Sequence, residues 1–249
     1  MRKKKKLISV GSRLTTVEGT SWQFDTRVAQ YFDKHVKQSI PHYESIQKYI
    51  CSLSEWFIKK DSIIYDLGCS TGETAKNICN FNYDRKVNFK FIGIDTNKQM
   101  IKLAKKKISN CPCKSNIQFR CQNINTIKSF SESDLFISIL LFPFLNLSQR
   151  KSLLKKIYKS LNTGGALIFI DKINSNNPKL QDMFNQIYFD FKLDNKLSKS
   201  QILNKAKSLR GSMNIFQEDE IKFFCKEVGF KKIDTFFRWF NFIGFVALK

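Results

Sequence analysis

The chain has 249 residues, 42% of them hydrophobic, and its 43 lysines and arginines against 21 acidic residues give a formal net charge of +22. This length suffices for one α/β domain with a sizeable core. No apolar run reaches the roughly 18 residues needed to span a bilayer, which excludes a membrane-spanning protein, and no membrane partner is expected. The lysines are spread along the chain, which favours solvated helix surfaces over a dedicated RNA-binding face.

The N-terminal segment begins with a basic run and is predicted to form a flexible tail over residues 1–20. Residues 21–249 are interpreted as a single domain. Between Trp22 and Lys60 apolar residues recur at helical spacing with a break at Pro41, so two helices are expected before the first strand.

Strands and helices then alternate along the middle of the chain. The predicted strands are 63–67, 89–95, 117–121, 134–140 and 165–170, and the predicted helices are 72–80, 97–109 and 148–161. Gly164 and Gly165 are expected to separate the last helix from the strand that follows. This alternation predicts an α/β fold with a mostly parallel sheet and right-handed crossovers.

The C-terminal third breaks the alternation. A lysine-rich helical insertion is expected over about 174–213, followed by a helix at 218–228. Strands at 232–240 and 243–248 close the chain around Asn241. We interpret them as the last pair of a seven-stranded sheet whose final strand is antiparallel.

Two strand ends carry the features of a nucleoside site. The first strand ends at Asp66 and leads into a turn in which Gly68 removes the Cβ from a tight bend and Gly72 lets the next helix pack closely. The second strand ends at Asp95, where a neighbouring parallel strand delivers a carboxylate to ribose hydroxyls. Together the two strand ends predict a nucleoside-binding crevice.

The turn distinguishes between kinds of nucleoside. A dinucleotide fingerprint reads G-x-G-x-x-G, whereas here Asp66 stands two residues before the first glycine and Ser70 replaces the second. The pattern resembles the first motif of class I methyltransferases, which have a Rossmann-like fold and bind S-adenosyl-L-methionine. The resemblance implies that Asp66 holds the amino end of the methionine moiety and that Asp95 takes both ribose hydroxyls.

The cysteines bear on the compartment and on metal binding. Seven cysteines are scattered along the chain without a preceding signal peptide, so a reduced, cytoplasmic setting is expected. Cys111 and Cys113 have no second pair at ligand spacing, and the chain has two histidines, so no metal is expected.

Eight short sequence stretches, distributed between Phe24 and Lys249, form a further pattern. They are Phe24-Asp25-x-Arg27-Val28-Ala29, Ser39-x-Pro41-x-Tyr43, Tyr65-Asp66-Leu67-Gly68-Cys69-Ser70, Lys156-Ile157-Tyr158, Leu161-Asn162-x-Gly164-Gly165-Ala166-Leu167, Asp190-Phe191-Lys192, Trp239-Phe240-Asn241-Phe242 and Val246-Ala247-Leu248-Lys249. Together they resemble the carboxy-S-adenosyl-L-methionine synthase family within the class I methyltransferases.

This resemblance implies a transferase that converts S-adenosyl-L-methionine and prephenate to carboxy-S-adenosyl-L-methionine and phenylpyruvate. The product serves the carboxymethoxy modification of the tRNA wobble uridine, so S-adenosyl-L-methionine is a substrate and direct tRNA binding is not required. A homodimer is also implied, in which the partner subunit supplies an arginine to the new carboxylate. The implied cofactor-binding residues are Tyr43, Asp66, Gly68, Cys69, Ser70, Asp95, Thr96, Asn123 and Ile124.

Three positions depart from the family pattern. In an ungapped match Asn123 replaces the adenine-binding aspartate, Ile139 replaces an asparagine after the fourth strand, and Ala206 replaces the arginine that grips the new carboxylate. Leaving a buried carboxylate without that cation costs about 3 kcal/mol. The candidates to pair with it instead are Lys205, Lys207 and Arg210.

Two alternatives remain open. One is an S-adenosyl-L-methionine-dependent methyltransferase acting on RNA or a small molecule, although Ile-Leu-Leu-Phe-Pro at 139–143 stands where a base-amine methyltransferase carries Asn-Pro-Pro-Tyr. The other is a catalytically decayed cofactor-binding module, which Ala206 and Ile139 together suggest.

Overall fold

A computed structural model describes residues 26–83 and 85–249 of the chain. The predicted tail at residues 1–20 lies outside the described residues. Helices α2 (Thr26–Ser39) and α3 (Tyr43–Ser54) precede the first strand and are separated at Pro41, as predicted. His42 between them adopts a left-handed backbone conformation with φ of 55°.

The sheet has the predicted parallel organisation. Its strands are β1 (Ser62–Leu67), β2 (Phe89–Asp95), β3 (Ile117–Cys121), β4 (Ser133–Ile139), β5 (Leu161–Asn174), β6 (Phe216–Gln217), β7 (Lys232–Trp239) and β8 (Phe242–Leu248). They are ordered β3-β2-β1-β4-β5-β8-β7, with β6 beside β5. Strands β1 to β5 are parallel, and β8 runs antiparallel to both β5 and β7. The predicted fold class is therefore confirmed.

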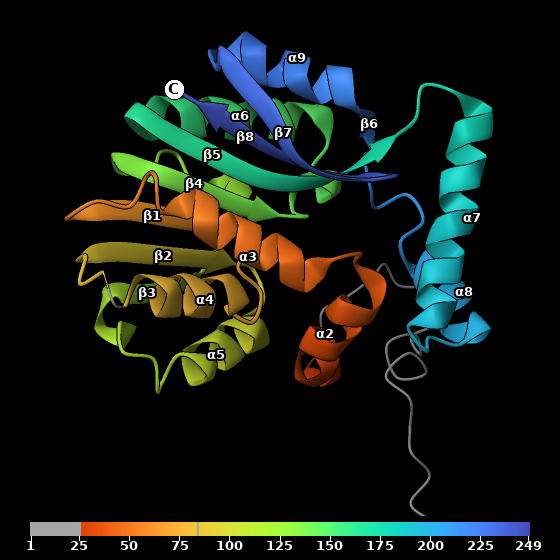
Figure 1. Cartoon of the computed structure of the whole chain (residues 1–249), viewed down its shortest axis with the longest axis horizontal. Helices are drawn as coiled ribbons and strands as arrows, with labels where there is room; N and C mark the ends of the chain where they lie inside the picture. Colours follow the sequence, from red (N-terminus) through yellow and green to blue (C-terminus); the bar gives the residue numbers. More distant parts are fainter. Residues whose placement is uncertain (1–25, 84) are drawn as a thin grey trace, which may run out of the picture.

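Helices cover both faces of this sheet (Figure 1). Apolar side chains of α3, α4 (Glu73–Asn82) and α5 (Lys98–Lys107) form one core against the sheet. Those of α6 (Leu147–Ser160) and α9 (Glu218–Val228) form the other core on the opposite face. Short 3-10 turns lie at Lys114–Asn116, Ile124–Thr126 and Phe142–Phe144.

Two helices of the predicted insertion, α7 (Pro178–Asp194) and α8 (Lys199–Ser208), stand beyond one end of the sheet, with α2 near them (Figure 1). Two hydrogen bonds join this group. The Tyr188 hydroxyl donates to the Ser39 carbonyl at 2.8 Å, and Gln38 Nε2 donates to the Asn195 carbonyl at 2.8 Å. The three helices thus cover the C-terminal ends of the parallel strands.

Strand β5 is longer than predicted at both ends. It begins at Leu161, because the Gly164-Gly165 pair forms an irregularity inside the strand: Ser133 pairs with Leu161 and Leu135 with Ala166. Gly164 takes a φ of 79°, which a residue with a side chain rarely adopts. The expectation that the glycines precede the strand was wrong.

The other end of β5 extends to Asn174 because it gains partners that the sequence pattern did not reveal. Lys172 pairs with Phe242 of β8, and Ile173 pairs with Phe216 of β6. Strand β6 has two residues, which is too short for an alternating pattern to be detected.

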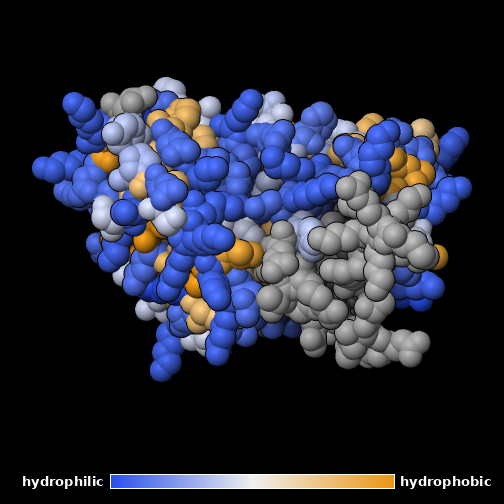
Figure 2. All heavy atoms as spheres, turned by 90° about the horizontal axis from the view of Figure 1, so that it is seen from below, coloured by the Kyte–Doolittle hydropathy of each residue, from blue (hydrophilic) through white to orange (hydrophobic). Residues whose placement is uncertain are grey.

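Hydrophilic residues cover most of the face seen in Figure 2 and are not gathered into one patch. None of the helices in the described part of the chain combines the length and apolar character that a bilayer crossing needs.

Candidate functional site

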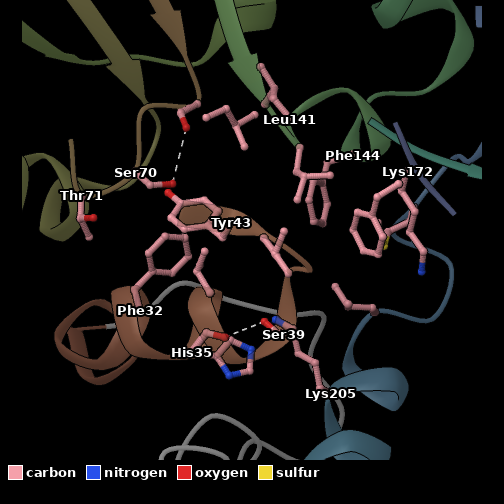
Figure 3. Close-up of a pocket in the computed structure, with 18 of the residues that line it drawn as sticks. Phe32, His35, Ser39, Tyr43, Ser70, Thr71, Leu141, Phe144, Lys172 and Lys205 are labelled. Carbon is pink, nitrogen blue, oxygen red and sulfur yellow. Dashed lines mark hydrogen bonds between the residues drawn. The ribbon is translucent and has the colours of Figure 1, made fainter. Parts of the chain in front are cut away.

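A cavity of about 690 Å³ lies at the C-terminal ends of the parallel strands. Residues at the ends of β1, β2, β4 and β5 line one side of it, and α2, α3, α7 and α8 contribute many of the others. Figure 3 shows Ser70 and Thr71 on the side of the cavity opposite Lys172, with Phe32, His35 and Ser39 of α2 along a third side.

The turn after β1 has the geometry that its glycines predict. Gly68 has a φ of 79°, and the N–H groups of Gly68 and Cys69 donate to the Ile94 carbonyl at 2.8 and 3.0 Å. A Cβ added to Gly72 would lie 2.9 Å from the Ala104 Cβ, so only glycine allows α4 to begin this close to α5. The conformation of the turn is therefore fixed by its hydrogen bonds to β2 and by the packing of α4 against α5.

Two carboxylates define an acidic end of the cavity. Asp66 is 2% exposed, and its Oδ2 is buried without a hydrogen-bond partner among the residues that the structure describes. Burial, reinforced by the charge of Asp95, raises the pKa of Asp66 to about 8. Asp95 accepts hydrogen bonds from the N–H groups of Ser70 and Asn97, both at 2.9 Å, although burial still raises its pKa.

Tyr43 and Cys69 complete the wall at this end. The Tyr43 hydroxyl accepts a hydrogen bond from Gln47 Nε2 at 3.0 Å, which fixes the ring from within α3. Burial, followed by the charges of Asp66 and Asp95, raises the pKa of the Cys69 thiol well above its usual value. Cys69 is therefore a neutral wall residue rather than a nucleophilic thiolate.

The opposite end of the cavity is cationic, with Lys172 of β5, Lys192 of α7 and Lys205 of α8 in its wall. Burial and the charge of Lys172 lower the pKa of Lys192 to about 7. Burial and the charge of Lys192 lower the pKa of Lys205 well below its usual value. His35 has a pKa lowered to about 4, by burial first and then by Lys205 and Lys192. Three lysines are thus gathered in a region where burial disfavours their charged form unless an anion is present.

The structure brings most of the predicted site residues together. Those that line the cavity are Tyr43, Asp66, Gly68, Cys69, Ser70, Asp95, Thr96, Ile139, Lys205 and Ala206. Asn123 does not line it, and its side-chain oxygen caps the following 3-10 turn by accepting from Asn125 N–H at 2.9 Å. Ile124 is buried in a hydrophobic core. Lys207 and Arg210 are exposed and also lie outside the cavity wall.

Lys172, Tyr188 and Lys192 are not among the predicted site residues, although Lys192 belongs to the stretch Asp190-Phe191-Lys192 that resembles the family. Two signals were present. A lysine directly after the apolar run Ala166–Ile170 and Asp171, and before the apolar Ile173, is unusual unless its charge has a use. Asn185, Tyr188 and Lys192 recur at three- and four-residue spacing, which puts them on one face of a helix.

Across the part of the chain that the structure describes, no three histidine, cysteine, aspartate or glutamate side chains come together as a metal site needs.

A parallel sheet closed by an antiparallel strand, with carboxylates after its first two strands and a tight glycine turn between them, defines the class I methyltransferase fold. The cavity fits S-adenosyl-L-methionine. A buried carboxylate oxygen without a partner suits the ligand's ammonium group, because a buried polar atom needs a hydrogen bond.

Comparison with known proteins agrees with this class. A methyltransferase-domain family matches residues 64–165. The carboxy-S-adenosyl-L-methionine synthase of Staphylococcus epidermidis is 34% identical over 229 residues, covering 92% of this chain and 97% of that protein. The synthase of Sulfurimonas denitrificans is 34% identical over 235 residues, covering 92% and 94% of the two chains. The chain therefore belongs to the carboxy-S-adenosyl-L-methionine synthase family of methyltransferase-like enzymes.

Solved structures support the fold. A SAM-dependent methyltransferase from Aquifex aeolicus aligns with a TM-score of 0.57 at 14% identity, covering 91% of this chain and 99% of that one.

Proposed function

We propose that this enzyme converts S-adenosyl-L-methionine and prephenate to carboxy-S-adenosyl-L-methionine and phenylpyruvate. The product would supply the carboxymethoxy modification of the tRNA wobble uridine, a cytoplasmic process in which this protein need not bind tRNA itself. The names of the relatives and the motifs that run along the chain support the proposal.

The observation that carries the proposal is that one cavity has an acidic end and a cationic end. An enzyme that transfers a methyl group to a neutral acceptor has no need of buried cations beyond the cofactor. An enzyme that builds a carboxylate inside a closed site does need them, because an unpaired buried carboxylate is poorly stabilised.

The acidic end suits the substrate nucleoside. In this proposal the Asp66 carboxylate accepts from the ammonium group of the methionine moiety, and Asp95 accepts from the ribose hydroxyls. Tyr43, Gly68, Cys69, Ser70 and Thr96 supply the surrounding wall. Asn123 and Ile124 keep their proposed role beside the adenine from the family resemblance, although neither lies in the cavity wall.

Lys205 is the proposed partner of the new carboxylate. It lines the cavity directly beside Ala206, the position at which the family has its arginine. Lys207 and Arg210, the other two candidates, are exposed and lie outside the wall. A lysine provides a point charge instead of the two-pronged contact of a guanidinium group, so weaker binding of the carboxylate is expected.

The bond changes of the proposed reaction balance. The bond from the prephenate ring to its carboxylate breaks, and its electron pair completes the aromatic ring as hydroxide leaves. The released carbon dioxide forms a new carbon–carbon bond with the methyl carbon beside the sulfonium. The proton lost from that methyl group joins the hydroxide to give water.

Mass spectrometry of the bound nucleoside tests the proposal. The purified protein is incubated with S-adenosyl-L-methionine, with or without prephenate, and its ligand is then extracted. We expect the carboxylated nucleoside only when prephenate is present. Recovery of only S-adenosyl-L-methionine or its homocysteine product under both conditions would refute the proposal.

We also propose a homodimer. Large apolar side chains are exposed on α7 and α8, where α7 carries Leu180, Met183, Phe189 and Leu193 and α8 carries Leu203. Exposed apolar side chains of this size are commonly covered in a permanent assembly. Sedimentation analysis should give the mass of two chains, and a Met183→Asp substitution should shift it toward one. A wild-type protein that sediments as a single chain contradicts the dimer.

A decayed binding module is a second candidate, and a specific observation favours it: Ile139 and Ala206, both departures from the family pattern, line the cavity. Calorimetry separates the two candidates. Tight S-adenosyl-L-methionine binding without any turnover of prephenate would support the module.

A further inference from the structure

Lys172 and Lys192 lie close to the same aromatic ring in the cavity. The Lys192 Nζ is 3.6 Å from the centre of the Tyr188 ring, and the Lys172 Nζ is 5.2 Å from the same point. The Tyr188 hydroxyl is held by the Ser39 carbonyl at 2.8 Å, so the ring is a fixed platform. The two ammonium groups are therefore brought to one small region of the wall.

The surroundings of the two ammonium groups bear on what they bind. Among the residues that the structure describes, no carboxylate pairs with Lys172 or Lys192. The charged groups that depress the pKa values in this region are lysines, since Lys172 acts on Lys192 and Lys192 acts on Lys205. Repulsion between desolvated cations is relieved when an anion binds between them.

A buried ion pair fixes the backbone that carries Lys172. Arg150 Nη1 lies 2.5 Å from Asp171 Oδ2, and both side chains are almost fully buried. The other Asp171 oxygen accepts the Lys172 N–H at 2.8 Å. The guanidinium carbon of Arg150 lies 4.9 Å from the centre of the Phe216 ring, which ties this end of β5 to β6. The fold thus supports the position of the lysine.

There is also space for a second molecule. Lys172 and Asn185 line both the large cavity and a smaller one of about 340 Å³. Lys172 therefore lies where the two cavities meet, on the side away from Ser70 and Thr71 (Figure 3).

We infer that Lys172 and Lys192, together with the Tyr188 ring, form an anion subsite that binds a carboxylate group of the second substrate, a small dicarboxylate. The subsite is separate from Lys205, which is assigned to the carboxylate formed on the nucleoside. The inference rests on the proposed function for the identity of that dicarboxylate as prephenate. The ring of Tyr188 offers an apolar surface to the carbon skeleton between the two carboxylates.

Calorimetry on the full-length protein tests the subsite. The protein is saturated with S-adenosyl-L-homocysteine, which has no methyl group to react, and is then titrated with prephenate and with malonate. We compare Lys172→Met and Lys192→Met with the control Lys179→Met, an exposed lysine at the start of α7 outside both cavities. Binding of S-adenosyl-L-homocysteine and the melting temperature are measured for every variant.

Each cavity variant should weaken dicarboxylate binding by about tenfold or more, because a charge-assisted contact is lost. Its affinity for S-adenosyl-L-homocysteine should stay the same, and its melting temperature should not fall, since a desolvated cation is removed. The control should behave as wild type. A purely structural role for the lysines on the Tyr188 ring predicts the reverse: a lower melting temperature with unchanged dicarboxylate binding.

Failure of the subsite and failure of the proposed reaction give different results. Equal prephenate binding by wild type and both variants overturns the subsite, as does a wild-type protein that binds neither dicarboxylate. Lysine-dependent binding of malonate without any binding of prephenate leaves the subsite standing and removes prephenate as the substrate.

Discussion

The acidic and cationic ends of the cavity are built from different parts of the chain. Asp66 and Asp95 sit at strand ends, next to a turn whose N–H groups are bonded within the fold. Lys192 and Lys205 sit on α7 and α8, helices inserted between β5 and β6. In the proposed function, the ends of β1 and β2 thus carry the nucleoside contacts shared by the methyltransferase fold, and the insertion, together with Lys172 of β5, carries the contacts particular to this enzyme.

The largest expected effect comes from removing the acidic end. Asp66→Asn should weaken S-adenosyl-L-methionine binding about a hundredfold, because the ligand's ammonium group loses a buried charged partner. Calorimetry measures the loss, and Asp182→Asn, at an exposed position on α7, is the control. Unchanged affinity in Asp66→Asn would remove this carboxylate from the site.

The same variant should make the ligand-free protein more stable at alkaline pH. The pKa of Asp66 is raised to about 8 in the folded protein, so folding favours the protonated carboxyl. This contribution to the free energy of unfolding is fully present below the ordinary pKa of an aspartate and is lost as pH rises through about 8. The neutral amide of the Asp66→Asn variant takes on no such charge. Melting temperatures of both proteins near neutral pH and above pH 8 check this. The advantage of Asp66→Asn over wild type should be larger at the higher pH, and an advantage that shrinks as pH rises contradicts the prediction.

The next effect concerns the pH dependence of nucleoside binding. Since the pKa of Asp66 is about 8, its charged form becomes more abundant as pH approaches that value. Affinity for S-adenosyl-L-methionine should therefore rise about twentyfold between roughly pH 6 and pH 7.5. If the affinity of wild type does not change with pH, or changes equally in Asp66→Asn, the ionisation of Asp66 does not control binding.

The sequence predicted the acidic end better than the cationic end. Asp66, Gly68 and Asp95 follow from local patterns, because a strand end and a tight turn are written in consecutive residues. Lys172 and Lys192 are 20 positions apart in the sequence. They meet only because α7 folds back over the end of β5, which no local pattern encodes.

The strand boundaries also depend on contacts that the local sequence does not encode. Gly164 and Gly165 look like a helix stop from their neighbours alone, but pairing of Leu161 with Ser133 keeps them inside β5. Strand β6 exists because Ile173 of β5 lies beside Phe216. Both features depend on tertiary pairing rather than on local preference.

A smaller effect is expected from strengthening the cationic end. Ala206→Arg introduces a guanidinium group into the wall beside Lys205. Affinity for carboxy-S-adenosyl-L-methionine should rise about tenfold, because the guanidinium group contacts a carboxylate with two hydrogen bonds. Affinity for S-adenosyl-L-methionine, which lacks that carboxylate, is the internal control. An equal gain for both ligands would mean that the arginine does not contact the new carboxylate.

The smallest effect is expected at Ile139, which lines the cavity after β4. Ile139→Asn restores the polar group found at that position in the family, and one added hydrogen bond is worth about 1 kcal/mol. S-adenosyl-L-methionine affinity should rise a few-fold, as measured by calorimetry, with Ile139→Val as the apolar control. Equal affinities in the two variants would mean that the side chain at position 139 makes no polar contact with the ligand.

A crystal structure with bound carboxy-S-adenosyl-L-methionine tests the two-ended cavity most directly. We expect the ligand's ammonium group at Asp66, its ribose at Asp95 and its carboxymethyl group directed toward Lys205. A ligand bound with the carboxymethyl group directed away from the lysines, or bound outside this cavity, would contradict it.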